Sequence, residues 1–148
     1  MYHHILIATD GSERAHHALV HALTLGKAVG ASVTVLTATE PWTATEMASR
    51  AALGDRRPID DYEREAQAFA TRIFDAARHK ADEIGVACDY VHKPDSRPSE
   101  AILRVAQARG CDLIVVSSHG REGLSRMIIG SQAGEVIAGA KAPVLVCR

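Results

Sequence analysis

The sequence has 148 residues, of which 47% are hydrophobic and only 4% aromatic. This length suits one domain spanning residues 1–148, with a core built mainly from aliphatic side chains. The formal net charge is −1 at pH 7 and the isoelectric point is about 6.7. A near-neutral chain lacks the positive surface that attracts nucleic acids or anionic membranes, so neither is expected as a partner.

Targeting and cysteine patterns predict a cytoplasmic protein. The amino terminus has no charged region followed by a long apolar segment, and no apolar run approaches the roughly 18 residues of a membrane helix. Cys88, Cys111 and Cys147 are widely spaced and form no C-x-x-C pair. We therefore expect buried free thiols in a reducing compartment.

From the amino end onward, short runs of β-forming residues alternate with helical patterns, which is typical of an α/β fold. Residues 4–9 are a continuous apolar run, as expected of a central parallel strand covered on both faces. Asp10 and Gly11 end this strand, Ser12 is placed to cap the next helix, and Gly26 and Gly30 lie near the end of that helix. Later strands are expected at residues 32–39, 86–92, 113–118 and 144–147, and later helices at 60–83, about 98–109 and 131–140.

The middle of the chain combines a long loop with the longest helix. Residues 40–58 contain several helix and strand breakers and are expected to form a loop with a short helix around residues 45–52. In the 60–83 helix, apolar residues recur at helical spacing and predict a stripe that faces the core. That stripe comprises Tyr62, Ala66, Phe69, Ile73 and Ala76, with Lys80 as a further candidate.

Five strands joined by helical crossovers predict a single doubly wound, Rossmann-like parallel sheet with helices on both faces and strand order 3-2-1-4-5. This order places the carboxyl ends of the first and fourth strands side by side. Ligands of open α/β sheets bind outside these ends, at the point where the strand order reverses. Asp10 and the segment from Ser117 to Ser131 are therefore expected to share one crevice.

Residues 113–131 read LIVVSSHGREGLSRMIIGS, a strand followed by a glycine loop and a helix start. A helix start leaves backbone N–H groups without acceptors, and glycine lets an anion approach the backbone. Gly120, Gly130 and Ser131 are therefore candidates to hold phosphate; the alternative is a structural turn, and Ser131 is also placed to cap the helix. Neither G-x-x-x-x-G-K-[ST] nor G-x-G-x-x-G occurs, which argues against a P-loop enzyme and an ordinary dinucleotide dehydrogenase.

Three motifs together resemble the universal stress protein family over essentially the whole chain. They are ATDGS at residues 8–12, APVLVCR at residues 142–148, and a form of the G-x2-G-x9-G-[ST] pattern of ATP-binding family members. The last pattern falls on Ser117, Gly120, Gly130 and Ser131, so that a serine replaces its first glycine. The resemblance implies an adenine nucleotide α-hydrolase-like fold with ATP in the crevice, and it leaves Mg²⁺ open as an accompanying ion. Ser117 adds a Cβ near this ligand, together with a hydroxyl able to donate a hydrogen bond.

The resemblance also implies roles for individual residues. Asp10 is expected beside the ribose and base, with a brace in the turn as the alternative, and the backbone of Ala38 is expected to meet adenine. Arg121 and Arg126 either neutralise phosphate charge or are solvated. The nucleotide-binding residues implied are Ala8, Asp10, Ala38, Ser117, His119, Gly120, Arg121, Gly130, Ser131 and Gln132.

We expect a cytoplasmic homodimer that holds ATP and acts as a nucleotide-dependent stress-response module, with the apolar edge strand Val144–Cys147 pairing with its own copy. One alternative is a nucleotide-free dimeric stress protein acting through protein partners. This alternative remains because Ser117 replaces the first glycine of the ATP-binding motif. The other is a slow ATPase, which the lack of a P-loop lysine and of an evident base argues against. His17 and His21 have metal-ligand spacing but no third ligand, so no metal site is expected there.

Overall fold

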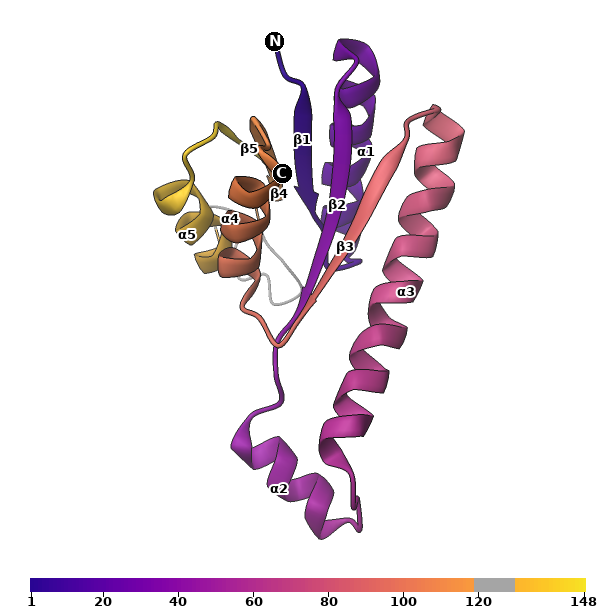
Figure 1. Ribbon diagram of the computed structural model, residues 1–148, viewed down its shortest axis with the longest axis vertical. Coiled ribbons are helices and arrows are strands. Elements are labelled where there is room, and N and C mark those ends of the chain that lie inside the picture. Colours follow the sequence, from indigo (N-terminus) through magenta and orange to yellow (C-terminus); the bar gives the residue numbers. More distant parts are fainter. Residues whose placement is uncertain (119–129) are drawn as a thin grey trace.

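The computed structural model describes residues 1–118 and 130–148. In these residues, five strands form one parallel sheet in the order β3-β2-β1-β4-β5, which confirms the predicted topology (Figure 1). The strands are β1 (His4–Ala8), β2 (Ser32–Thr39), β3 (Cys88–Pro94), β4 (Leu113–Ser117) and β5 (Val144–Cys147).

Helices cover both faces of the sheet, as the fold class predicted. On one face, α1 lies mainly against β1 and β4, and α3 lies against β2 and β3. On the other face, α4 and α5 pack together over a second apolar cluster. The helices are α1 (Glu13–Val29), α2 (Ala44–Ala52), α3 (Pro58–Ile84), α4 (Pro98–Arg109) and α5 (Ser131–Gly139).

The central strand β1 is buried on both faces. Ile5, Leu6 and Ile7 are each 0% exposed, with Ile5 and Ile7 in the cluster under α1 and Leu6 in the cluster under α4. Burial of each of these side chains stabilises the fold by about 1.5–3 kcal/mol. This double-sided burial explains the continuous apolar run, and it fixes the residues that follow β1 at the carboxyl edge of the sheet.

Side chains of Ser12 and Thr43 cap the first two helices. Ser12 Oγ accepts a hydrogen bond from Ala15 N at 3.2 Å, and Gly30, in the left-handed region with φ of 70°, ends α1. Thr43 and Glu46 form a reciprocal capping box at the start of α2. The Ser12 cap and the short helix within residues 40–58 are both as predicted.

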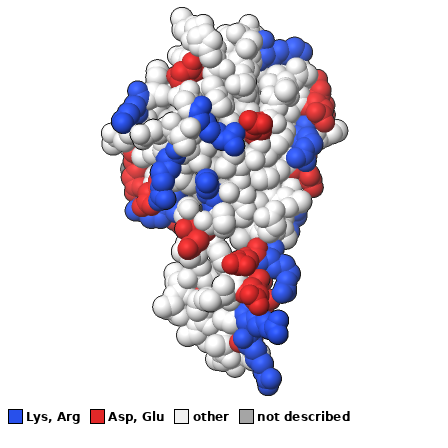
Figure 2. All heavy atoms as spheres, viewed as in Figure 1, with Lys and Arg blue, Asp and Glu red and all other residues white. Residues whose placement is uncertain are grey.

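α2 and the amino-terminal part of α3 form an arm that projects from the body (Figure 1). α2 contains no buried residue, and the arm is held at its base by Trp42, whose ring meets Tyr62 edge-on at 5.5 Å. Arg50 lies 3.5 Å from the centre of the Trp42 ring and binds Glu65 at 3.1 Å. Figure 2 shows charged side chains along the α3 side of the arm and mainly uncharged atoms on the α2 side.

One detail of the helices differs from the sequence predictions. The buried face of α3 is a stripe of Ala66, Ala70, Ile73, Ala77 and Ala81, whereas Ala76 is exposed. The difference arises because the neighbouring element determines which side of a helix is covered, and periodicity leaves that side uncertain by one residue. Gly26 lies in the last turn of α1, near its end as predicted, and is buried against β2.

None of the helices in residues 1–118 and 130–148 is long and apolar enough to cross a membrane. All three cysteines are free; Cys111 is buried as predicted, whereas Cys88 and Cys147 are half-buried. Burial raises the pKa of the Cys88 thiol to about 11 and also raises the pKa values of Cys111 and Cys147. The three thiols are therefore protonated and weakly nucleophilic at neutral pH.

Replacing Gly26 by alanine should lower the free energy of unfolding by about 1–3 kcal/mol, because an added Cβ overfills the core at that point. This Cβ would lie 2.7 Å from Cγ2 of Val33. Gly134 in α5 is the matched control, since a Cβ there meets no atom within 4 Å. Gly134→Ala should raise the free energy of unfolding by up to about 1 kcal/mol. Urea unfolding measures both changes, and stabilisation by Gly26→Ala would contradict the tight contact.

Candidate functional site

Asp10 lies in the turn between β1 and α1, at the carboxyl edge of the sheet. Its Oδ1 accepts a hydrogen bond from Ser12 N at 2.9 Å, and Thr9 Oγ1 accepts one from Gly11 N at 3.2 Å. Gly11 has a φ of 77°, a conformation that favours glycine. The bracing role considered for Asp10 is therefore present. The bond engages one carboxylate oxygen, so bracing does not exclude a contact of the other oxygen with a ligand.

Ala8 and Ala38 lie near the carboxyl ends of the two neighbouring strands β1 and β2. Both are half-buried and both border the apolar cluster under α4 and α5. The register pairs Ala8 with Leu36, so Ala38 lies two residues further along the adjacent strand and on the same face. The two methyl side chains take up little volume at this edge, which suits the close approach of a flat group.

Backbone hydrogen bonds at the end of β4 bring the start of α5 to the same edge. Ser118 N donates to Cys147 O at 2.7 Å, and Gly130 N donates to Ser118 O at 2.7 Å. Ser117 is half-buried and Ser118 is buried. The chain therefore leaves β4 and returns beside it at Gly130. His119, Gly120, Arg121 and Arg126, all singled out from the sequence, lie outside the described residues.

α5 begins directly at this return point. The prediction that Ser131 caps the helix is wrong, because Gly130 occupies the N-cap position and Ser131 is the first helical residue. Glycine offers no side-chain acceptor, and the first turn contains no acidic residue. The N–H groups of Ser131, Gln132 and Ala133 have no acceptor within the helix, so this end of α5 carries partial positive charge.

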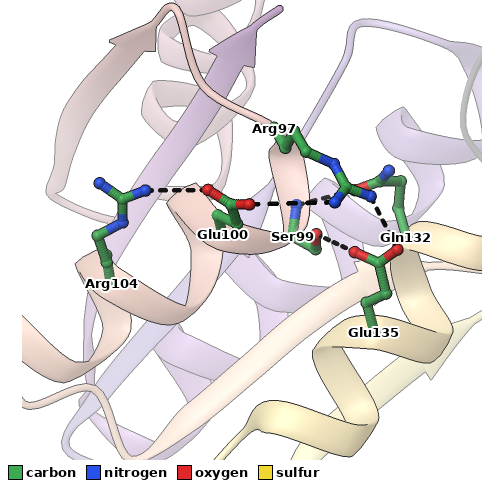
Figure 3. A network of polar contacts seen from close by, with 6 residues as sticks. All are labelled: Arg97, Ser99, Glu100, Arg104, Gln132 and Glu135. Carbon is green, nitrogen blue, oxygen red and sulfur yellow. Dashed lines mark hydrogen bonds and ion pairs between the residues drawn. The ribbon is translucent and has the colours of Figure 1, made fainter.

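Gln132 has a structural contact that the sequence did not reveal. Its Oε1 accepts a hydrogen bond from Ser99 N at 2.9 Å, in the first turn of α4 (Figure 3). The N-cap of α4 is Arg97, whose side chain does not cap the helix, so Gln132 supplies an acceptor from the neighbouring helix. The side-chain amide of Gln132 is therefore engaged by α4, while its backbone N–H remains in the open first turn of α5.

Arg97 is the charged residue at this site that sequence analysis missed. Its Nη2 lies 2.9 Å from Glu135 Oε1, so the guanidinium bridges from the start of α4 to the first turns of α5, and about half of its side chain is exposed. Hydrogen bonding from the Ser99 hydroxyl, aided by Arg97, holds the pKa of Glu135 below its usual value. The sequence pointed to Arg97 only indirectly. Pro98 and Glu100 mark the start of a helix, and Arg97 directly precedes that start.

The sequence model of the universal stress protein family matches residues 1–148. The chain belongs to the universal stress protein family. Universal stress protein YxiE of Bacillus subtilis is 31% identical over 149 residues, covering 100% of each chain. Among solved structures, protein MJ0577 of Methanocaldococcus jannaschii superposes with a TM-score of 0.80 at 25% identity, covering 99% of this chain and 96% of that one.

Other structures of this fold contain adenine nucleotides. A universal stress protein in complex with cAMP has a TM-score of 0.69 at 22% identity and covers 99% of this chain and 97% of its own. An Arabidopsis thaliana family protein with AMP bound has a TM-score of 0.64 at 18% identity, covering 98% and 90%. At these identities the similarity to this chain is one of fold, and the ligands are those of the two proteins themselves.

Metal-binding clusters are absent from the part of the chain that the structure describes: no three His, Cys, Asp or Glu side chains come together there in a suitable arrangement. His17 and His21 accordingly have no third ligand from this set. The described site combines backbone N–H groups and small side chains with the carboxylate of Asp10, the amide of Gln132 and the Arg97–Glu135 ion pair.

Replacing Gln132 by leucine should lower the free energy of unfolding by about 1–2 kcal/mol, because the N–H of the buried Ser99 loses its acceptor. Gln132→Glu keeps an acceptor at the same reach and should retain most of the stability. Chemical unfolding of the two variants measures the difference. Equal stability of Gln132→Leu and the unsubstituted protein would show that the contact with α4 contributes nothing.

Proposed function

We propose that this universal stress protein binds ATP at the carboxyl edge of β1 and β4 and acts in the cytoplasm as a nucleotide-dependent regulatory module of the stress response. The observation that supports this most is the open first turn of α5, where Gly130 leaves three backbone N–H groups without a capping side chain. Such a helix start is a binding site for phosphate oxygens.

In this proposal the nucleotide lies along the edge of the sheet. The N–H groups of Ser131 and Gln132, with the Ser131 hydroxyl, bind phosphate oxygens at α5. Asp10 faces the ribose and base, since a carboxylate next to phosphate is repelled. Ala8 and Ala38 provide a flat apolar surface for adenine. Ser117, His119, Gly120 and Arg121 complete the proposed set on the basis of the sequence motif.

Charge balance favours Mg²⁺ as a companion of ATP in this site. Arg97 adds one positive charge near the start of α5, and Glu135 offsets it at 2.9 Å. The partial charge of a helix start is equivalent to roughly +0.5 elementary charge, far less than a triphosphate carries. A divalent cation bound between the phosphate oxygens would reduce the remaining repulsion, including that from Asp10.

Regulation follows if the nucleotide binds one conformation better than another. A ligand shifts a conformational equilibrium only by its difference in affinity for the two states, and no chemical step is needed. Catalysis is not part of the proposal, because no P-loop lysine is present to act on the phosphates. The competing function is a nucleotide-free module acting through protein partners, which is favoured by Ser117 at the first glycine of the motif.

Calorimetric titration with ATP and Mg²⁺, preceded by mass spectrometry of the denatured protein for co-purified nucleotide, tests this proposal. We expect bound ATP, and we expect Gly130→Leu to weaken its affinity by about tenfold or more, equivalent to ~1.4 kcal/mol. Gly130 has a φ of −57°, which leucine also adopts, so the variant should keep its melting temperature. Absence of nucleotide and of binding heat would select the nucleotide-free function.

We also propose a homodimer through β5. This strand is at an edge of the sheet, and Val144, Leu145, Val146 and Cys147 are all half-buried rather than covered. An unpaired edge offers a row of backbone donors and acceptors, and a two-fold axis lets it pair with its own copy. Light scattering should give twice the chain mass at micromolar concentration. A monomer across that range would exclude the pairing.

A further inference from the structure

A hollow lies between α1 and α3, on the face of the sheet opposite the proposed nucleotide site. It has a volume of about 260 Å³ and is lined by Thr9, Gly11, His16, Phe69, Arg72 and Ile73, among others. Successive residues of a strand point to opposite faces. Thr9 therefore faces this hollow, whereas Ala8 faces the proposed nucleotide site.

Thr9 lines the hollow, and beside it in the sheet is a buried hydroxyl, that of Thr37, with no hydrogen-bond partner among the described residues. Thr37 is 1% exposed, and its Oγ1 has no hydrogen bond to any described residue. The register pairs Ala8 with Leu36, which makes Thr37 the lateral neighbour of Thr9 on the same face. A buried hydroxyl without a hydrogen-bond partner lowers the stability of the fold by about as much as the loss of one hydrogen bond. A polar atom of a bound molecule would remove that cost.

The hollow is also lined by an arginine without a carboxylate partner. Along α3, Arg64 and Arg78 each pair with the aspartate three residues earlier, at 2.9 and 3.2 Å. At Arg72 the residue three positions earlier is Phe69, and Asp75 is engaged by Arg78. Within residues 1–118 and 130–148, Arg72 has no recorded ion pair or hydrogen bond. Its guanidinium is exposed at the hollow and is available to an external anion.

The walls of the hollow are mainly apolar and closely spaced. Phe69 and Ile73 of α3 face Leu19 of α1 across the hollow. At Gly11 an added Cβ would lie 3.1 Å from Cγ1 of Ile73. A side chain at this position would therefore narrow the hollow, whereas glycine leaves the space open. The hollow thus combines a cationic arginine, apolar walls and the hydroxyl-bearing Thr9, with the buried Thr37 hydroxyl directly behind it.

We propose that this hollow binds a small carboxylate with a compact apolar or aromatic body. The carboxylate pairs with Arg72, the body lies against Phe69 and Ile73, and a polar substituent at its far end bonds Thr37. Arginine matches a carboxylate with two parallel hydrogen bonds, which gives the site its preference for this group. The site is independent of the proposed nucleotide function, because it lies on the other face of the sheet.

Binding of 4-hydroxybenzoate to the full chain tests this proposal. Calorimetric titration should give a millimolar dissociation constant, with or without saturating ATP. Arg72→Gln should weaken binding about tenfold or more, by loss of a charge-assisted hydrogen bond. Arg78→Gln, on the same helix but with its own aspartate partner, should leave the affinity unchanged. Unsubstituted benzoate should bind several-fold more weakly than 4-hydroxybenzoate, and Thr37→Val should abolish that difference.

A crystal soaked in 4-bromobenzoate locates the ligand independently, because the anomalous signal of bromine identifies its position. We expect the bromine peak between α1 and α3. Ala76 is exposed at the edge of the hollow, so Ala76→Trp should abolish this peak by blocking the hollow, without changing the melting temperature. The proposal is overturned if the bromine appears at the start of α5, if ATP competes with the ligand, or if Arg72→Gln and Arg78→Gln bind equally well.

Discussion

The candidate site depends on which of two neighbouring helix starts receives a side-chain hydrogen-bond acceptor at the carboxyl edge of the sheet. α4 and α5 pack together, and each begins with N–H groups that no residue of the same helix satisfies. Gln132 of α5 gives its side-chain oxygen to Ser99 of α4, so the start of α4 is occupied from within the protein. No equivalent acceptor comes from Gly130 at α5. One helix start is thus capped by the neighbouring helix, and the other has no side-chain cap and is the proposed position of the phosphates.

The sequence was sufficient to predict the fold because its strongest signals are local. The apolar run of β1, the β-branched β2 and the glycines that end α1, α3 and α4 determine the element order, and crossover handedness then gives the observed topology. Contacts between elements were not predictable in this way. Gln132 binds α4 and Arg97 binds Glu135 only because two helices far apart in sequence lie together. For the same reason periodicity included Ala76 in the core stripe of α3, where packing buries Ala77 instead.

Strand alternation divides the carboxyl edge into two chemically different surfaces. Ala8 and Ala38 face α4 and α5, where small side chains and N–H groups without a side-chain cap from Gly130 suit the proposed nucleotide. Thr9 and Thr37 face α1 and α3, where hydroxyl groups, apolar walls and Arg72 suit a small carboxylate. Because β1 and β2 supply both surfaces, the two proposed ligands would be separated by little more than the thickness of the sheet. The buried core of β1 holds both surfaces in place.

The most direct test of the central claim is a nuclear magnetic resonance titration of the ¹⁵N-labelled protein with ATP. We expect the amide signals of Ser131, Gln132 and Ala133 to move most, because their N–H groups change from solvent to phosphate acceptors. The amide of Ser99 is the internal reference, since Gln132 already occupies it at 2.9 Å, and it should move far less. Saturation with ATP that leaves the first turn of α5 unshifted, or that shifts Ser99 as strongly, would contradict the account.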